Sequence, residues 1–419
     1  MKDRNNISNS QPKVDWPIFI VAVIIILLCA IPLLIFPEEA SKILKDGRDV
    51  IMTNFLWLYL IVGISAFSFC LWLALGRYAH VKLGSPDESP EYSNIHWVSM
   101  MFTTAVGASV IAWGFAEPIF YLQAPPLGIE VGSSKSFEWA HMYPLLHWGI
   151  VPWSMYALPS VPIAYMLYVR RYPVLRISSA CDGALPKRGR GQIKTIIDIL
   201  IVLGIVGGVA TSLGLGVPLL SAMLATLFEI PDNMIIKISV LSLWTLLFGA
   251  SVYRGLKSGI KVLANINIVL AIFAILFVLI AGPGVFIMDL TVNSIGLMFN
   301  NFIRAATWTD PIQNGSFPED WTGFYWGWWL AYTGMVGLFF GRISRGRTIR
   351  QLVLGVICWG SLGSWMFLAI MGGYSLYLEN TETLAVSEIL RDQGMSYVNA
   401  WVIQSLPFGK FTLFIFTLL

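Results

Sequence analysis

The sequence predicts an all-α polytopic membrane protein, and three observations lead to this fold class. Hydrophobic residues make up 56% of the 419-residue chain and charged residues only 12%, about half of the charge that a soluble domain carries. Apolar runs long enough to cross a bilayer recur along nearly the whole chain. Lysine and arginine gather in alternate loops between these runs. These features exclude an ordinary soluble domain.

Nine apolar runs are predicted to span the membrane, and a tenth begins near Leu406 and is cut off at Leu419. Because that last run has no polar flank, we expect the sequence to be incomplete at its C-terminus. The nine runs lie at residues 16–36, 54–76, 96–122, 140–168, 195–228, 235–252, 261–288, 321–341 and 350–377.

The positive-inside rule predicts a cytoplasmic N-terminus, with residues 1–15 as an inner tail. Most of the 27 Lys and Arg residues then fall in inner loops, whereas most acidic residues fall in outer ones. Because the basic residues are spread evenly over the inner loops, they indicate topology rather than a nucleic-acid or lipid patch. We therefore expect no nucleic acid as a partner. Membrane lipid is expected as a partner because the apolar runs lie in the bilayer.

The outer segment at 289–320 is too long for a simple turn. Apolar and polar faces alternate from Ser294 to Ile303, which predicts a helix lying in the outer interface. A second element of this kind is expected from Thr383 to Gln404. No nucleophile elbow, paired-carboxylate site, phosphate-binding loop or metal-ligand spacing is found in the sequence, so no enzyme activity and no cofactor are expected.

The most informative stretch begins at Trp321, where four of the seventeen tryptophans fall within nine residues. On a helix, Trp321, Tyr325, Trp328 and Tyr332 follow one another at i, i+4, i+7 and i+11, with Trp329 close beside them. Two interpretations compete for this stripe. It is either packing or an interfacial aromatic belt, or it is a π-lined pocket for a cation without hydrogen-bond donors, such as a quaternary ammonium.

A helix rich in small residues, Thr103 to Tyr121, is the next candidate. Small residues allow close helix packing, but they also make a helix easy to unwind, so that its carbonyl groups can bind an ion or a substrate. Glu117 lies within this span and precedes Pro118, which loosens the turn before it. A buried carboxylate there either locks helices together or takes part in transport.

The fourth span, around His147 to Tyr156, again places Trp and Tyr beside a Gly and a Pro. His147 is either a hydrogen-bonding group between helices or a protonation switch. Two helices that combine aromatic residues with Gly or Pro breaks, one early and one late, match the inverted-repeat pattern of secondary transporters.

These residues together resemble the betaine/carnitine/choline transporter family, over nearly the whole chain from Trp16. The matching motifs are Asp320 to Trp329, the basic segment Arg342 to Thr348, and Ala210 to Gly216. His147-Trp148 with Pro152-Trp153 and Tyr156, and Gly114 with Glu117, also match. Gly323 departs from the family, which usually has a branched aliphatic residue there, but it lies off the aromatic face.

The resemblance implies twelve spans and a leucine-transporter-like inverted-repeat fold, of which this chain would hold about 9.5 helices. The expected division is the tail at 1–15, two peripheral helices at 16–76, a first repeat at 96–288, the outer segment at 289–320 and an incomplete second repeat at 321–419. A homotrimer in the inner (cytoplasmic) membrane is also implied.

The resemblance further implies an aromatic box for the substrate and a separate outer vestibule. The box residues would be Trp148, Trp153, Tyr156, Trp328, Trp329, Tyr332 and Phe120, and the vestibule residues would be Trp321 and Tyr325. Each ring contributes about 0.5–2 kcal/mol to cation binding. Micromolar binding requires about 8 kcal/mol, more than a few rings provide. The carboxylate or hydroxyl of the substrate must contribute the rest of this binding free energy, through backbone groups near Gly107 to Ser109.

Coupling stays open between sodium symport and substrate exchange. The unwound stretch Ala105, Val106, Gly107, Ala108 and Ser109 offers carbonyl groups to an ion such as Na⁺ or to the substrate. Lys261 lies where an exchanger carries a cation in place of sodium, but symporters also have Lys there. Tyr332, in place of a frequent Trp, slightly favours the carnitine/butyrobetaine exchangers.

Two other functions are weighed against transport of a quaternary amine. A membrane sensor for the same ligands would need a signalling domain, and the chain offers only short loops and a fifteen-residue tail. An amino-acid transporter of the same fold would need acceptors for an –NH₃⁺ group, and the aromatic stripe argues against it.

Overall fold

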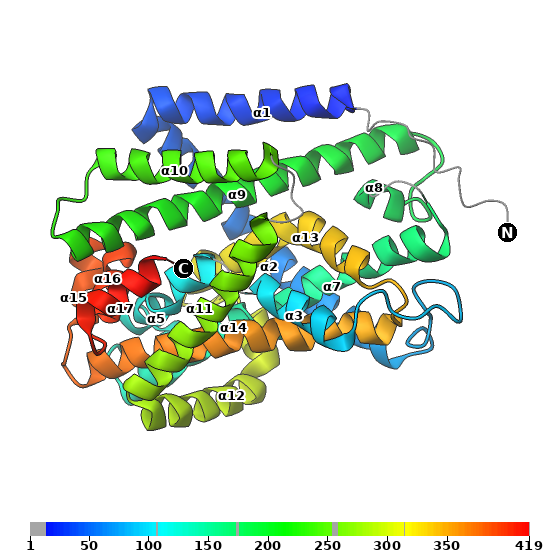
Figure 1. The fold of residues 1–419 in the computed structure, drawn as a ribbon. Helices are drawn as coiled ribbons and strands as arrows, with labels where there is room; N and C mark the ends of the chain where they lie inside the picture. The colour runs from blue at the N-terminus through cyan, green and yellow to red at the C-terminus, as the bar shows by residue number, and fades with distance from the viewer. Residues whose placement is uncertain (1–13, 106–107, 173–175, 254–258, 314, 419) are drawn as a thin grey trace.

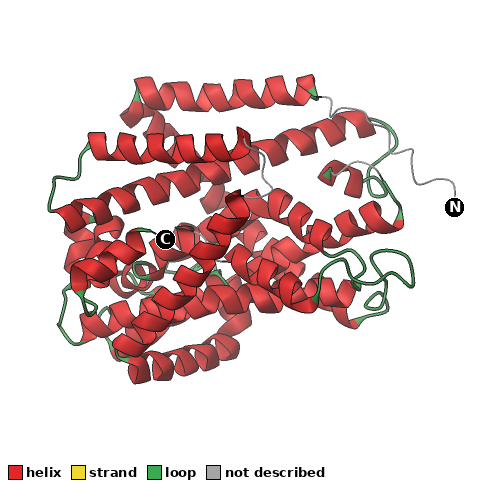
Figure 2. Cartoon of the chain, in the orientation of Figure 1, coloured by secondary structure: helices red, strands yellow, loops and turns green. Residues whose placement is uncertain are grey.

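The computed structural model describes residues 14–105, 108–172, 176–253, 259–313 and 315–418 (Figures 1 and 2). Every regular element among these residues is a helix, apart from an isolated bridge between Lys82 and Thr348. Helices suit a membrane because each one satisfies its backbone hydrogen bonds within its own segment. The predicted all-α fold class is therefore confirmed.

The first two helices are α1 (Trp16–Ile35) and α2 (Pro37–Leu75). α2 begins well before residue 54, where the sequence analysis placed the start of its apolar run. Pro37 at its first position and the acidic Glu38 and Glu39 in its first turn form a favourable helix N-terminus. The sequence predicts an outer loop for the charged residues that follow, but these residues continue the same helix.

The span predicted at 96–122 is broken into three helices. These are α3 (Asn94–Ala105), α4 (Ala108–Gly114) and α5 (Glu117–Gln123). The chain bends by 58° between Asn94–Thr104 and Ser109–Gln123. A single 3₁₀ turn, η1 (Pro126–Gly128), follows.

The fourth span is also broken, after His147. It consists of α6 (Ser134–His147), α7 (Ile150–Ala164) and a π-helical turn, η2 (Tyr165–Val169). It thus begins earlier than the predicted residue 140. Next come the short α8 (Ile177–Ala180), then α9 (Arg190–Phe228), α10 (Met234–Tyr253) and α11 (Gly259–Ala281). α9 packs against both α1 and α10 along one side of the molecule (Figure 1).

The outer segment that was predicted at 289–320 contains α12 (Gly284–Thr307). This helix begins after Gly282-Pro283, so it includes residues that were assigned to the preceding span. It packs against α6 and α14, and Figure 1 shows it beside α14. Its length and apolarity also satisfy the criteria for a membrane span.

The last part of the chain starts with a π-helical turn, η3 (Pro318–Gly323), followed by α13 (Phe324–Ile343) and α14 (Ile349–Asn380). Thr348 caps α14 through a capping box with Gln351. The second expected interfacial element forms two helices, α15 (Val386–Gln393) and α16 (Met395–Gln404), and α17 (Gly409–Thr417) is the last helix.

Six helices in the described parts of the chain are long and apolar enough to cross a membrane, or seven if the bent α3–α5 segment counts as one. Fewer spans meet these criteria than the sequence analysis predicted. The described parts of α10 and α11 that are apolar, Met234–Ala250 and Ile266–Ala281, are shorter than a span. The many Trp, Tyr and Gly residues of α13 lower its hydropathy. α7 and α13 pack along each other at the centre, with α14 against α7 and α9 against α13.

Candidate functional site

A cavity of about 190 Å³ lies between α7 and α13 and is closed by residues of α3, α4 and α9. Its walls are aromatic and aliphatic with a few hydroxyl groups, and they contain no Asp, Glu, Lys or Arg among the described residues. The lining residues are Thr104, Ser109, Val110, Trp148, Trp153, Tyr156, Ser212, Trp328, Trp329, Tyr332, Met335 and Val336.

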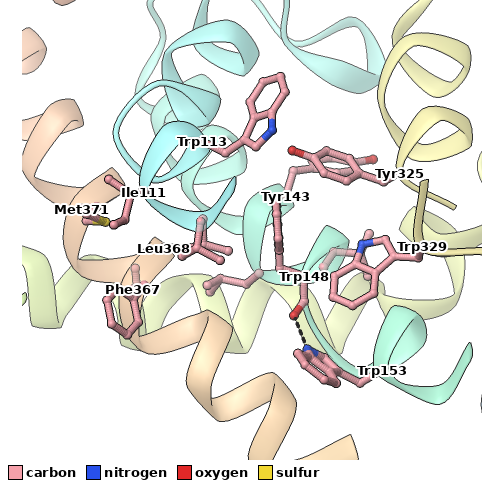
Figure 3. Close-up of a cluster of buried hydrophobic side chains, with 14 of the residues drawn as sticks. Ile111, Trp113, Tyr143, Trp148, Trp153, Tyr325, Trp329, Phe367, Leu368 and Met371 are labelled. Atoms are coloured by element: carbon pink, nitrogen blue, oxygen red, sulfur yellow. Dashed lines mark hydrogen bonds between the residues drawn. The ribbon is translucent and has the colours of Figure 1, made fainter. Parts of the chain in front are cut away.

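Five rings of this wall meet at nearly perpendicular or tilted angles. The ring centre of Trp148 lies 5.5 Å from that of Trp328 and 5.7 Å from that of Trp329. Trp329 in turn lies 5.4 Å from Trp153 and 4.8 Å from Tyr156. Figure 3 shows Trp148, Trp153 and Trp329 converging from the two helices. Edge-to-face contacts of this kind fix the orientation of the rings that line the cavity.

The break between α6 and α7 places Trp148 in this wall. Gly149 follows it, and a Cβ atom there would lie 2.3 Å from the Leu145 carbonyl oxygen and 2.6 Å from the Trp365 indole nitrogen. Only glycine fits so close a backbone approach. The indole N–H of Trp153 donates to the Trp148 carbonyl oxygen at 3.1 Å. The break is therefore built into the packing of α7 and α14.

The facing wall comes from α13 and is docked on α9. The Tyr332 hydroxyl donates to the Gly208 carbonyl oxygen and lies 2.7 Å from the Ser212 Oγ. A Cβ atom on Gly208 would lie 2.7 Å from the Tyr332 ring, so this glycine lets the two helices touch. The indole N–H groups of Trp328 and Trp329 are buried and have no hydrogen-bond partner among the described residues.

Trp326 occupies another side of α13 and faces α2. It is fully buried, and its indole nitrogen lies 2.7 Å from the position of a Cβ atom on Gly63 of α2. Its ring contacts His147 edge-on at 5.8 Å between ring centres. Trp326 therefore packs α13 against α2 and does not line the cavity.

Glu117 is fully buried and accepts two side-chain hydrogen bonds. Its Oε2 accepts from the Trp148 indole N–H at 2.9 Å, and its Oε1 accepts from the Tyr121 hydroxyl at 2.6 Å. The Tyr121 oxygen lies 2.8 Å from His147 Nδ1, and His147 Nε2 lies 3.1 Å from Thr322 Oγ1. This chain of contacts joins α5, α6 and η3, and it ends on a residue of the cavity wall.

A comparison with known families agrees with this geometry. The family model of the betaine/carnitine/choline family transporters, BCCT, matches residues 17–419. The chain belongs to the betaine/carnitine/choline transporter family. Family membership makes it a multi-pass membrane protein that carries out secondary transport of quaternary ammonium compounds, and it points away from an enzyme. The earlier resemblance is thus confirmed.

The structure brings six of the seven expected box residues together around one cavity of this BCCT transporter. These six are Trp148, Trp153, Tyr156, Trp328, Trp329 and Tyr332. Phe120 is the exception, because it lies 5.3 Å from Trp321 and 6.1 Å from Trp113, outside the cavity lining. The resemblance implies a box position for Phe120, whereas in this chain Phe120 lies on α5, beyond the breaks that separate α3, α4 and α5.

The two expected vestibule residues, Trp321 and Tyr325, lie next to the rings of Trp113 and Phe120. Trp321 belongs to the π-helical turn η3 and stacks at 6.5 Å on Tyr325. Tyr325 is fully buried and stacks on His147 at 4.8 Å, while its ring centre lies 5.6 Å from that of Trp148. Tyr325 therefore separates Trp321 from the rings of the cavity.

The expected ion or substrate stretch is described only in part. Val106 and Gly107 lie outside the described residues, as do the side chains of Ala105 and Ala108. Ser109 lines the cavity. Lys261 lies in α11, but its side chain is outside the described part of the chain. No cluster of three His, Cys, Asp or Glu side chains suited to a metal is found among the residues described.

Several lining residues were missed by the sequence analysis, namely Thr104, Val110, Ser212, Met335 and Val336. Ser212 lies in the Ala210–Gly216 motif, so its position in a small-residue stretch of α9 was the available signal. Met335 and Val336 continue the Trp328–Tyr332 face by one turn of α13. Extending the helical stripe toward its C-terminal end predicts both.

Proposed function

We propose that the chain carries a betaine-, carnitine- or choline-type substrate across the cytoplasmic membrane by alternating access, with the ammonium head held in the cavity between α7 and α13. The observation that carries this proposal is the set of six Trp and Tyr rings that surround a cavity without a charged lining residue among those described. A trimethylammonium group has no N–H to satisfy, so ring faces suit it better than polar acceptors do.

The rings alone do not account for tight binding. Each cation–π contact contributes about 0.5–2 kcal/mol, whereas micromolar affinity requires about 8 kcal/mol. The buried indole N–H groups of Trp328 and Trp329 have no partner among the described residues. Together with the hydroxyl groups of Ser109 and Ser212, they are donors for the carboxylate or hydroxyl of the substrate.

Coupling is proposed to be either sodium symport or substrate exchange. The broken helix α3–α4 places Thr104 and Ser109 in the cavity wall on either side of the bend. Hydroxyl and carbonyl oxygens at such a break suit a monovalent cation next to the substrate. The hydroxyl oxygens of these two residues would then be ligands for Na⁺ in a symporter.

Counterflow tests both parts of this proposal. Proteoliposomes preloaded with unlabelled choline, glycine betaine, carnitine or γ-butyrobetaine are diluted into the labelled compound, with and without sodium. We expect uptake of at least one quaternary amine. A requirement for sodium indicates symport, and sodium-independent uptake that needs an internal substrate indicates exchange. Absence of counterflow with every compound would overturn the proposed transport function.

The membrane arrangement is proposed from the charge distribution and from the family. The bias of Lys and Arg toward one set of loops supports a cytoplasmic N-terminus in the inner membrane, and the family supports a homotrimer. An engineered cysteine in the basic loop after α13 should react only with membrane-permeant thiol reagents in intact cells. Native mass spectrometry tests the trimer.

A further inference from the structure

We infer that Glu117 makes the cavity selective for positive charge, acting through Trp148 without touching the substrate. The inference rests on the proposed function and names the feature of the substrate that the site recognises. It follows from the hydrogen bond between Glu117 Oε2 and the indole N–H of Trp148, 2.9 Å long and fully buried on the carboxylate side. Glu117 is thus a positioning residue behind one ring of the wall.

The charge of this carboxylate has no Lys or Arg partner among the described residues. Its hydrogen-bond and ion-pair contacts are with Trp148, Tyr121 and His147, and the neutral Tyr325 hydroxyl also lies close enough to interact with it. With His147 neutral and its proton on Nδ1, every contact of this network is satisfied: Nδ1–H donates to the Tyr121 oxygen at 2.8 Å and Nε2 accepts from the Thr322 hydroxyl at 3.1 Å. A buried carboxylate without a cationic partner is costly. A cation in the cavity would supply the missing counter-charge.

The hydrogen bond also carries the charge toward the cavity. An anionic acceptor on the indole N–H increases electron density in the ring, which strengthens the attraction of its face for a cation. A cation held within about 6 Å of the Trp148 ring centre also feels the carboxylate directly in a medium of low dielectric constant. Trp148 is itself only 6% exposed, so water screens this attraction little.

The expected consequence is discrimination between ligands of the same shape and different charge. Choline and 3,3-dimethyl-1-butanol differ only by carbon in place of the ammonium nitrogen, as do glycine betaine and 3,3-dimethylbutanoate. A cavity that recognises its ligands by hydrophobic fit alone would bind both members of a pair equally. A cavity that also feels the Glu117 charge binds the member with the ammonium nitrogen more tightly, with a dissociation constant at least about tenfold lower.

The test compares dissociation constants for both pairs, measured by competition with the best labelled quaternary amine on the full chain in nanodiscs. Glu117→Gln keeps an oxygen acceptor for the Trp148 N–H but removes the charge. We expect it to weaken choline about tenfold, to leave 3,3-dimethyl-1-butanol within about twofold, and to strengthen binding of the anionic dimethylbutanoate. Glu229→Gln is the matched control, because Glu229 is an exposed acid at the end of α9.

The outcomes separate this inference from a purely structural role. A structural role would weaken both members of each pair equally, so that an unchanged ratio in Glu117→Gln overturns the inference. If that variant does not fold, Glu117→Asp is used instead, because it retains the charge. We expect Glu117→Asp to bind both members of a pair more weakly and to keep the ratio of their dissociation constants. Loss of that ratio would contradict the inference. Equal binding of both pair members by the unaltered chain also overturns the inference. Binding of no quaternary amine at all would instead overturn the proposed function.

Discussion

The indole N–H of Trp153 donates to the backbone carbonyl oxygen of Trp148 across the break between α6 and α7, at 3.1 Å (Figure 3). The same N–H lies 3.2 Å from Ser364 Oγ on α14. A helix end leaves its last carbonyl groups without partners inside the helix. Trp153 therefore supplies a cavity ring and also satisfies a carbonyl group exposed by the break.

Replacing Trp153 by Phe should reveal this second role. The variant keeps a ring in the wall but removes the donor to the Trp148 carbonyl. Loss of a partner for a buried polar group costs about 1–3 kcal/mol, so we expect a lower melting temperature and weaker substrate binding. Trp401→Phe is the control, since its N–H bonds Gln393 at an exposed position on α16. Equal effects of the two changes would contradict this role.

The two faces of α13 should respond differently to substitution. Trp328→Ala removes a ring from the cavity wall, and we expect uptake of the transported quaternary amine in proteoliposomes to fall at least about tenfold. Trp326→Phe is the comparison, because Trp326 packs against α2 and an alanine there would cost about 3–5 kcal/mol of stability. Trp326→Phe should lower the melting temperature but leave the substrate Kd within about twofold. Unchanged uptake in Trp328→Ala would refute the aromatic box.

Gly149 should not tolerate even a methyl group. Its Cβ would meet the Leu145 carbonyl oxygen at 2.3 Å, and backbone cannot yield as a flexible side chain does. We expect Gly149→Ala to abolish stable expression or to lower the melting temperature sharply, as judged by fluorescence size-exclusion chromatography. Gly207→Ala in α9 is the matched control, because nothing lies within 4 Å of its Cβ position. That change should be neutral or stabilising, by up to about 1 kcal/mol.

The loop after α2 should give the stability a pH dependence. Its Glu88 has a pKa lowered from 4.5, chiefly by the hydrogen bond from the Ser85 backbone N–H and also by the Arg345 guanidinium. A carboxylate with a lowered folded-state pKa contributes stability above its unfolded pKa, and this contribution is lost as pH falls through the folded value. Glu88→Gln should therefore melt at a lower temperature than the unaltered chain at pH 7. The difference should shrink as pH falls below 4.5, and a difference independent of pH would contradict the assignment.

The sequence predicts the cavity rings well and the Glu117 network poorly, for physical reasons. Trp328, Trp329 and Tyr332 lie on one unbroken helix, so a period of 3.6 residues places them correctly. The resemblance, and not a helical period, implied a box position for Phe120, which lies on α5 beyond two breaks in the helix. The start of α2 was missed because its charged first turns match the composition of a loop.

Contacts between distant segments could not be predicted at all. The hydrogen bonds of Glu117 to Trp148 and of His147 to Thr322 depend on how separate helices are packed, and spacing along the chain contains no such information. The same holds for the docking of Tyr332 on Gly208. A buried acid within a membrane span indicates that partners are needed, but only the fold identifies them.

The cavity walls come from α7 and α13, which the expected repeat division assigns to different halves of the molecule. Any rocking of one half against the other must change the distances between Trp148, Trp153 and Trp329 together. Indole emission responds to the distance and polarity of neighbouring groups, so this cluster is a built-in optical reporter of conformation. Stopped-flow fluorescence of the unlabelled chain should thus follow the transport cycle without an attached dye.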